Sequence, residues 1–158
     1  MDEKKYYLTK DGLEKLKKEY ADLKNIKLAK TEGEVPKIWH SEDLNPEYLS
    51  FQEDLDFLNS RIAELEYILK NTEIIKVPSK DKKNTVGLGA TVTLEEAGGR
   101  INEFTLVGSL EANPSLGKIS NESPVGKFLL GHKLNDEVVI TSPIQIIYRI
   151  KKIRYNLT

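Results

Sequence analysis

The side chains most able to do chemistry gather in one short segment of this chain. Trp39, His40, Glu42 and Asp43 lie within five positions of one another. Carboxylates and imidazoles are metal ligands, but Mg²⁺ binds mainly to oxygen atoms and needs more of them than two acids provide. The same acids also fit a solvated loop ahead of a helix, where the helix dipole favours negative charge. Residue types and spacing therefore leave a metal site and a solvated loop both open.

Other catalytic signatures are missing from the sequence. There is no cysteine, which excludes disulfides and thiolate metal sites. Gly87 and Gly89 precede a strand pattern instead of opening a helix, so they do not form a phosphate-binding loop. The histidines, His40 and His132, are separated by most of the chain, and no serine stands in a hydrolase motif. The sequence predicts no self-contained enzyme active site.

Composition limits how the protein could work on nucleic acid. The 158 residues include 24 basic and 25 acidic side chains, for a net charge of -1. Proteins that hold DNA or RNA on their own surface carry a basic excess, because phosphate neutralisation supplies most of the affinity. Any nucleic acid here should thus be held by another protein. No apolar run approaches the ~20 residues of a membrane helix, and the charged start of the chain is unlike a signal peptide, so we expect a cytoplasmic location.

Two helical patterns flank the segment that contains the acids. The first begins at Thr9, a good N-cap, and should end between Thr31 and Pro36, because proline disrupts a helix interior. The second should begin with Asn45 as cap and Pro46 at the first helical position, and run to about Lys70. Alternating spacings of three and four place one apolar stripe on each helix. The stripes consist of Leu13, Leu16, Tyr20 and Leu23 in the first, and Tyr48, Phe51, Leu55, Leu58, Ile62, Leu65 and Leu69 in the second.

Neither stripe can be buried by its own helix. Two such helices joined by a short link pair naturally as an antiparallel hairpin. At 1.5 Å per residue the second helix would be about 35–40 Å long, too long for a small domain to cover. We therefore expect a projecting hairpin that carries residues 37–44 at its tip.

The second half of the chain has a different character. Residues 79–84 are polar and charged, as in a linker, and the strand patterns after them are short and broken by turn residues. Residues 97–100 read as a hairpin turn, and residues 125–130 as a short helix. The predicted strands span residues 90–94, 103–107, 137–141 and 146–155. The fold class is therefore α+β, with a small antiparallel sheet domain after the helices.

The order of these parts resembles the Gre family of transcript cleavage factors, of GreA/GreB type. The matching segments are residues 7–16, 43–48, 89–94, 107–108, 117–120, 122–127, 130–131 and 136–138. The resemblance implies a coiled-coil hairpin (residues 1–76), a linker (77–84) and an FKBP-like domain (85–158). It also implies an accessory factor, itself no enzyme, that acts on bacterial RNA polymerase as a monomer with no membrane attachment. The FKBP-like domain would bind the polymerase rim and the hairpin would enter the secondary channel, where the polymerase cuts backtracked RNA.

Residue roles follow from the same resemblance. Asp43 and Glu42 would help to position a Mg²⁺ ion that is shared with the polymerase active site, with no cofactor held stably by the factor itself. The tip would meet the channel and the RNA 3′ end, and the start of the short helix would meet the polymerase rim. The implied tip contacts are Trp39, His40, Asn45, Glu47 and Tyr48, and the implied rim contacts are Ser123, Pro124, Gly126 and Lys127.

The tip departs from the family pattern. The family signature reads Asp-Leu-x-Glu-Asn-Ala-Glu-Tyr, whereas this chain has Asp43-Leu44-Asn45-Pro46-Glu47-Tyr48, without two residues that include the second acid. Glu42 could supply a second carboxylate from a different direction. The alternative is thus a Gre-like regulator that occupies the channel and modulates or inhibits polymerase without stimulating cleavage. A chaperone or prolyl isomerase built on the FKBP-like domain is a more distant possibility.

Overall fold

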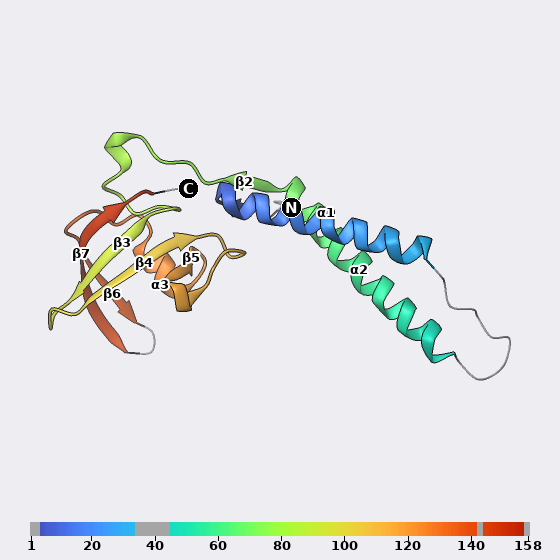
Figure 1. Cartoon of the computed structure of the whole chain (residues 1–158). Coiled ribbons are helices and arrows are strands. Elements are labelled where there is room, and N and C mark those ends of the chain that lie inside the picture. Colours follow the sequence, from blue (N-terminus) through green and yellow to red (C-terminus); the bar gives the residue numbers. More distant parts are fainter. Residues whose placement is uncertain (1–3, 34–44, 142–143, 157–158) are drawn as a thin grey trace. The chain divides into compact units, whose positions relative to one another are not determined.

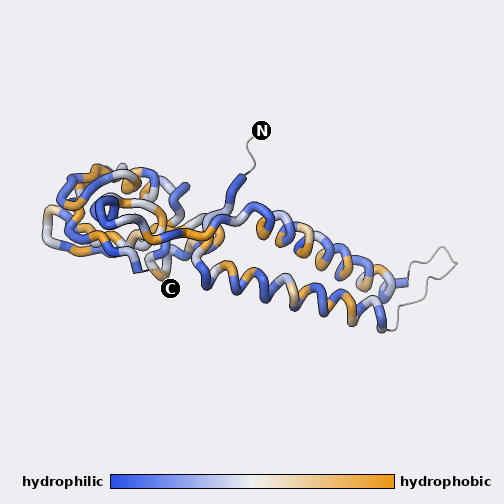
Figure 2. Tube along the Cα trace, turned by 90° about the horizontal axis from the view of Figure 1, so that it is seen from above, coloured by the Kyte–Doolittle hydropathy of each residue, from blue (hydrophilic) through white to orange (hydrophobic). Residues whose placement is uncertain are grey.

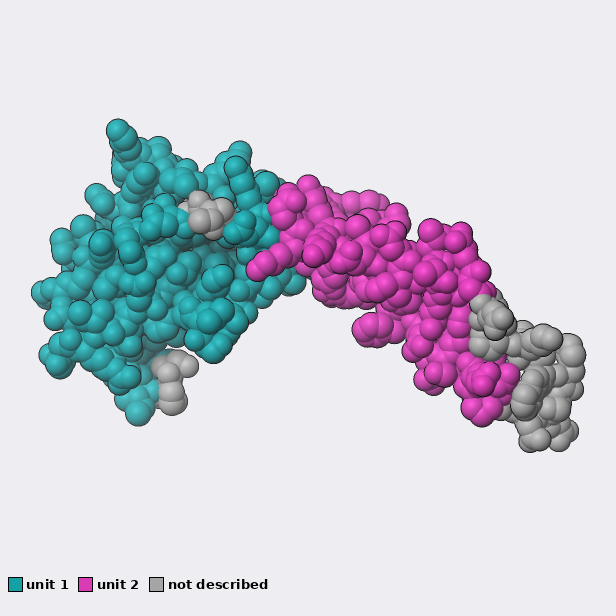
Figure 3. Space-filling model, in the orientation of Figure 1, with its two compact units in different colours: residues 1–12, 72–158 teal, residues 13–71 magenta. Residues whose placement is uncertain are grey.

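A computed structural model of the whole chain describes residues 4–33, 45–141 and 144–156 (Figure 1). The chain divides into two compact units (Figure 3). The helical unit contains residues 13–71. The sheet unit contains residues 72–158 together with residues 1–12, so the expected linker at residues 77–84 falls inside it. Each unit has its own secondary structure.

Two long helices make up nearly all of the described part of the helical unit. Helix α1 spans Lys10–Glu32, ending within the predicted interval, and α2 spans Pro46–Lys70 as predicted. The side chain of Asn45 accepts a hydrogen bond from the Glu47 N–H at 3.0 Å, which is the predicted N-cap. Pro46 fits the first helical position because no intrahelical partner is available there for an N–H.

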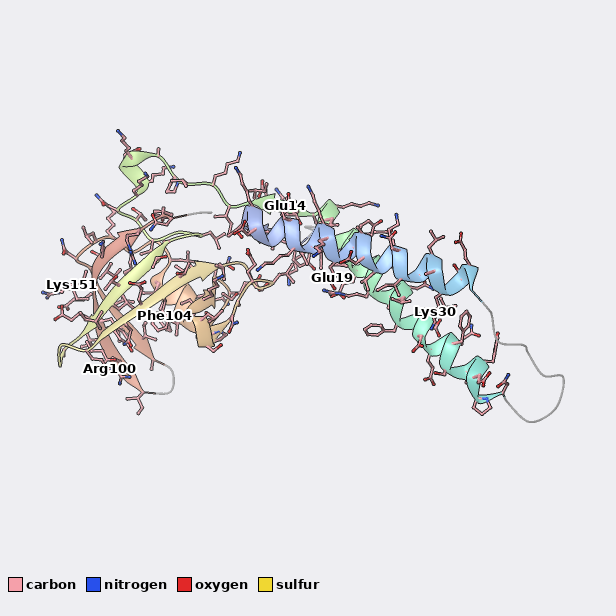
Figure 4. The ribbon with its side chains drawn as sticks, in the orientation of Figure 1. Glu14, Glu19, Lys30, Arg100, Phe104 and Lys151 are labelled. Carbon is pink, nitrogen blue, oxygen red and sulfur yellow. The ribbon has the colours of Figure 1, made fainter. Side chains whose placement is uncertain are left out.

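Side-chain bonds between α1 and α2 show that the helices are antiparallel. Arg61 donates to Glu19 with Nε–Oε1 at 2.8 Å, nearer the start of α1. Lys30 donates to Asp54 with Nζ–Oδ2 at 3.0 Å, nearer its end (Figure 4). As the residue number rises along α1, the partner's number falls along α2. The predicted hairpin is therefore confirmed, and Figure 2 shows apolar residues recurring along both of its helices.

Apolar packing within the hairpin is uneven. The buried side chains of α2 are Leu58, Ile62, Leu65 and Ile68, all in its C-terminal half. Ile68 is buried as well, whereas Leu69, the residue predicted at this end of the stripe, is only half-buried. On α1 the three-four spacing continues from Leu23 to Lys27 and Lys30. The line of contact between α1 and α2, called the seam below, is thus apolar in one half and partly ionic in the other.

Replacing Lys27 with leucine is expected to stabilise the helical unit. Lys27 is half-buried at a seam position, and a polar residue in a coiled-coil seam costs stability. Burying part of a leucine there should raise the free energy of unfolding by about 1 kcal/mol. Thermal unfolding followed by circular dichroism at 222 nm measures the change. Lys18→Leu, which alters an exposed residue outside the stripe, should give no comparable gain; equal gains from both would mean that Lys27 is not in the seam.

The sheet unit contains a five-stranded sheet in the order β5-β4-β3-β7-β6. Its strands are β3 (Thr91–Glu96), β4 (Ile101–Val107), β5 (Lys118–Ser120), β6 (Glu137–Thr141) and β7 (Gln145–Arg154). Four of these strands were predicted, with small shifts at their ends. The prediction of an antiparallel sheet needs one correction, because β5 pairs with β4 in parallel. That strand follows a 3-10 turn at Pro114–Leu116, which returns the chain in the same direction as β4.

One helix and the inner side chains of the strands form the core of this unit. Helix α3 (Pro124–Leu129), predicted at residues 125–130, contacts β5 and β6. The fully buried side chains include Leu94, Leu106, Leu129 and Ile150. The result is the expected small α+β domain, so the fold class predicted from sequence is confirmed.

A second, two-stranded sheet was not predicted. Strand β1 (Tyr6–Leu8) pairs in parallel with β2 (Thr72–Ile74), and a 3-10 turn (Lys80–Lys82) follows β2. Leu8 is only 1% exposed. The pairing explains why the residues before α1 belong to the same compact unit as the strands that follow α2.

Candidate functional site

The residues with the strongest chemical role in the sequence lie outside the described part of the chain. These are Trp39, His40, Glu42 and Asp43. The described residues of the helical unit end at Gly33, just after α1, and begin again at Asn45, just before α2. The acids therefore belong to the segment that connects the two antiparallel helices, and their roles remain predictions.

The described tip residues form the start of α2. Asn45 is buried at 9% exposure and caps the helix through its side chain. Its carbonyl accepts the Leu49 N–H at 3.1 Å, the first main-chain bond of the helix. Glu47 is exposed in the first turn and Tyr48 is half-buried. The shortened signature thus contains the start of α2, and the side chain of Asn45 is used as the N-cap of that helix.

The charged side chain of Lys30 lies near this end of the hairpin. Lys30, besides its bond to Asp54, places Nζ 5.2 Å from the centre of the Phe51 ring. Its side chain is 26% exposed. A partly desolvated lysine between a carboxylate and an aromatic face is attracted to both. Lys30 therefore joins the two helices in the part of the seam that lacks buried apolar residues.

The two helices carry opposite charge excesses. Helix α1 contains seven lysines and five acids, whereas α2 contains six acids, one arginine and one lysine. The cross-helix bonds of Arg61 and Lys30 with Glu19 and Asp54 show that each helix neutralises part of the other. Glu19 and Glu64 raise the pKa of Arg61 further above its usual range through hydrogen bonds. The hairpin has no excess of basic charge for holding nucleic acid by itself.

The predicted rim contacts are the N-cap of α3 and three residues of that short helix. Ser123 caps the helix: its Oγ accepts the Gly126 N–H at 3.1 Å and donates to the Ser120 carbonyl at 2.6 Å. Gly126 is buried, and a Cβ there would collide with that same carbonyl. Pro124 and Lys127 are exposed. Ser123 and Gly126 therefore shape the turn, while Pro124 and Lys127 are available to a partner.

Sequence reasoning missed one neighbour of this turn. Phe128 is 38% exposed, although aromatic side chains in so short a helix are usually buried. It lies four residues after Pro124, a spacing that puts two residues on the same face of a helix, and directly after Lys127 in the sequence. The sequence does contain a signal for the exposure of Phe128, because Leu129 and not Phe128 continues the core pattern of α3. That signal can be used only when the register of the helix is known.

A cavity of about 570 Å³ lies in the sheet unit beside β2, with Tyr7, Leu88 and Tyr155 in its lining. The Tyr155 hydroxyl donates to the Thr85 carbonyl at 2.5 Å. Burial raises the pKa of Tyr155, so this phenol is neutral at physiological pH. The hydroxyl holds main chain in place and is not poised as an acid or base.

Within the described residues, no three His, Cys, Asp or Glu side chains are grouped so as to hold a metal ion. None of the helices in that part of the chain is long and apolar enough to cross a membrane.

Comparisons with known proteins cover both units. Residues 6–74 match the family described as "Transcription elongation factor, N-terminal", and residues 80–155 match "Transcription elongation factor, GreA/GreB, C-term". Transcription elongation factor GreA of Thermomicrobium roseum is 38% identical over 86% of this chain and 88% of that protein. The GreA of Bacillus subtilis is 39% identical over 89% of this chain and 90% of that protein. Among solved structures, GreA factor homolog 1 of Thermus thermophilus is 27% identical, covers 96% of this chain and 99% of its own, and has a TM-score of 0.43. The chain belongs to the GreA/GreB family of transcription elongation factors.

Proposed function

We propose that this protein binds bacterial RNA polymerase, inserts its helical hairpin into the secondary channel, and stimulates the polymerase to cleave backtracked RNA. The antiparallel pairing of α1 and α2 is the main support, because the segment that joins them carries Glu42 and Asp43. Family membership over both units supports the same role. The near-neutral charge fits a factor whose partner supplies the affinity for nucleic acid.

The chemistry would follow the two-metal pattern of phosphodiester hydrolysis. One Mg²⁺ would be held by polymerase carboxylates, and Asp43 and Glu42 would complete the ligands of a second. Neither acid would act as a nucleophile; each would hold the ion, which lowers the pKa of the attacking water and stabilises the leaving oxygen. The factor itself would keep no metal when free, since two carboxylates provide too few oxygen ligands.

The sheet unit would provide the stable attachment to the polymerase rim. Pro124 and Lys127 are exposed on a helical turn whose geometry is set by Ser123 and Gly126. A rigid turn that presents one proline and one cation suits a partner with an apolar contact next to an acidic group. Phe128 would add to that contact.

The direct test follows the RNA 3′ end in backtracked elongation complexes to which the purified protein and Mg²⁺ are added. A cleavage factor should release short 3′ fragments at a rate at least ten times that of polymerase alone, since a well-placed metal ion stabilises the transition state by several kcal/mol and about 1.4 kcal/mol is already tenfold in rate. The same reaction with active, nucleotide-extended complexes is the control, and it should yield no fragments. Unchanged fragment release in the backtracked complexes would contradict the cleavage role.

A second function is favoured by the Asn45–Pro46 helix start, which lies directly after Leu44. Two fewer residues in the signature leave less chain between the acids and α2 than the family pattern has. If the acids then miss the ion, the protein would occupy the channel and slow nucleotide addition without releasing fragments. The same assay separates the two functions, because both fragments and extension products are visible in it.

A further inference from the structure

The first turn of α1 is capped by two residues that are far apart in sequence. Thr9 is the N-cap, and its Oγ1 accepts the Gly12 N–H at 3.1 Å. The same hydroxyl donates to Glu111 Oε1 at 2.6 Å, and the Thr9 N–H donates to Glu111 Oε2 at 2.8 Å. Both oxygens of one carboxylate therefore bind the residue that starts α1. All three residues belong to the sheet unit.

This arrangement has the bonds of a capping box with one member supplied from elsewhere. In the usual box the N-cap hydroxyl binds the N–H of the third helical residue, and a Glu at that third position returns to the N–H of the cap. Here the third position is Gly12, which has no side chain, and Glu111 makes the return bond. We propose that Glu111 completes the capping box of α1 from the sheet domain and is a positioning residue for the hairpin.

Gly12 makes room for the remote carboxylate. The residue is buried, and a Cβ at this position would lie against the Glu111 carboxylate, with Oε1 as the nearest atom. A glycine in a helix is otherwise unfavourable, because its backbone loses the most freedom on folding. The Glu111 carboxylate thus occupies the space that a side chain at position 12 would need, and it makes the bond that an acid at that position would make.

The turn that carries Glu111 also holds the strand before α1. The Glu111 N–H donates to the Gly108 carbonyl at 3.1 Å, which closes this turn. A Cβ at Gly108 would collide with the carbonyl oxygen of Tyr7 in β1. Residues 108–111 therefore contact both neighbours: Gly108 lets the backbone of β1 pack closely, and the Glu111 carboxylate binds the start of α1. We expect the first turn of α1 to fold only together with the sheet unit.

The functional consequence rests on the proposed function. A carboxylate delivered to a shared metal must be placed to about 1 Å, since an error of that size can cost on the order of a hundredfold in rate. Loosening the base of α1 should therefore lower the cleavage rate at saturating protein without changing polymerase affinity. Glu111 touches neither metal nor RNA in this scheme; it acts through Thr9.

The test is a double-mutant cycle in the full-length chain, with amide hydrogen exchange of Leu13 and Glu14 as the readout. Glu111→Ala should speed their exchange about tenfold, the usual effect of losing a helix cap. In the Gly12→Ala background, where the new Cβ already displaces the carboxylate, Glu111→Ala should change exchange less than twofold. Equal effects of Glu111→Ala in both backgrounds, or none in either, would overturn the proposal.

Two further variants separate the capping role from general destabilisation. Glu111→Gln keeps one acceptor oxygen and should give intermediate exchange, whereas Glu53→Ala removes an exposed carboxylate of α2 and should leave Leu13 unchanged. In the cleavage assay Glu111→Ala should lower the maximal rate at least threefold with the half-saturating concentration unchanged. If the wild-type protein does not stimulate cleavage, the proposed function fails but the exchange cycle still decides the role of Glu111.

Discussion

Asp43→Ala is expected to lower the rate of 3′-fragment release from backtracked complexes by about a hundredfold, the order of loss when a catalytic group is misplaced or removed. Of the two acids proposed to hold the metal, Asp43 is the one that aligns with the family signature, so it should provide the metal ligand with the correct direction. Affinity for polymerase should stay within about twofold, because loss of one solvated charge changes binding by well under 1 kcal/mol. Quantifying fragments over a titration of the protein gives both numbers.

Glu42→Ala and Asp56→Ala complete this experiment. Glu42 lies one position before the signature, so its loss should cost less, about tenfold, if it is a second ligand. Asp56 is an exposed acid of α2 and serves as the matched control with an unchanged rate. Should all three variants cleave like wild type, the tip acids do not hold the metal. Should wild type itself only slow extension, Asp43→Ala would distinguish a metal-blocking tip, which it relieves, from simple obstruction of the channel.

The hairpin was the most predictable part of the fold, for local reasons. The boundaries of α2 follow from Asn45 and Pro46 at one end and from an apolar stripe that is unbroken over its length. Tertiary packing was not needed to identify either feature. The burial of Ile68 shows the limit of this reasoning, because that residue lies outside the three-four spacing and its burial depends on packing that the spacing does not record.

Short strands were the least predictable elements. Strands β1, β2 and β5 have three residues each, too few to show an alternating pattern. Two of their pairings are also parallel: that of β1 joins the residues before α1 to those after α2, and that of β5 depends on the intervening 3-10 turn. Their positions are decided by contacts that sequence periodicity does not contain.

The candidate site also contains local contacts that the sequence predicts and long-range contacts that it does not. The cap at Ser123 and the cap at Asn45 could be predicted, because each bonds a main-chain N–H two or three residues away. The bond from Thr9 to Glu111 joins residues 102 positions apart and could not. Its only local trace is Gly12, which stands where a capping box would have an acid. The roles of Asp43 and Glu42 still rest on the family resemblance.

Gly126→Ala is expected to destabilise the sheet unit by about 1–3 kcal/mol, the usual cost of adding a methyl group to a closely packed site. In most helices this substitution is stabilising, by up to about 1 kcal/mol. Here the new Cβ would meet the carbonyl oxygen of Ser120, its carbonyl carbon at 3.0 Å and Asn121 Cα at 3.1 Å. All three are main-chain atoms, so no side chain can rotate away and the turn itself must move. Urea unfolding, monitored through hydrogen exchange of the Leu106 and Ile150 amides, measures the loss of free energy of unfolding.

The same substitution should also weaken polymerase binding, because the displaced turn presents Pro124 and Lys127. Lys127→Glu separates the two effects: it alters an exposed side chain, so stability should stay within about 0.5 kcal/mol, while reversal of the charge should weaken binding several-fold, mainly through the association rate. Gly98→Ala, at a position with open space around the added Cβ, controls for the loss of backbone freedom: it should leave binding unchanged and should not lower stability, which restricting the unfolded chain raises by up to about 1 kcal/mol. If Gly126→Ala lowers stability but both it and Lys127→Glu bind polymerase like wild type, the start of α3 is a structural turn only, and the rim contact must be sought on another face of the sheet unit.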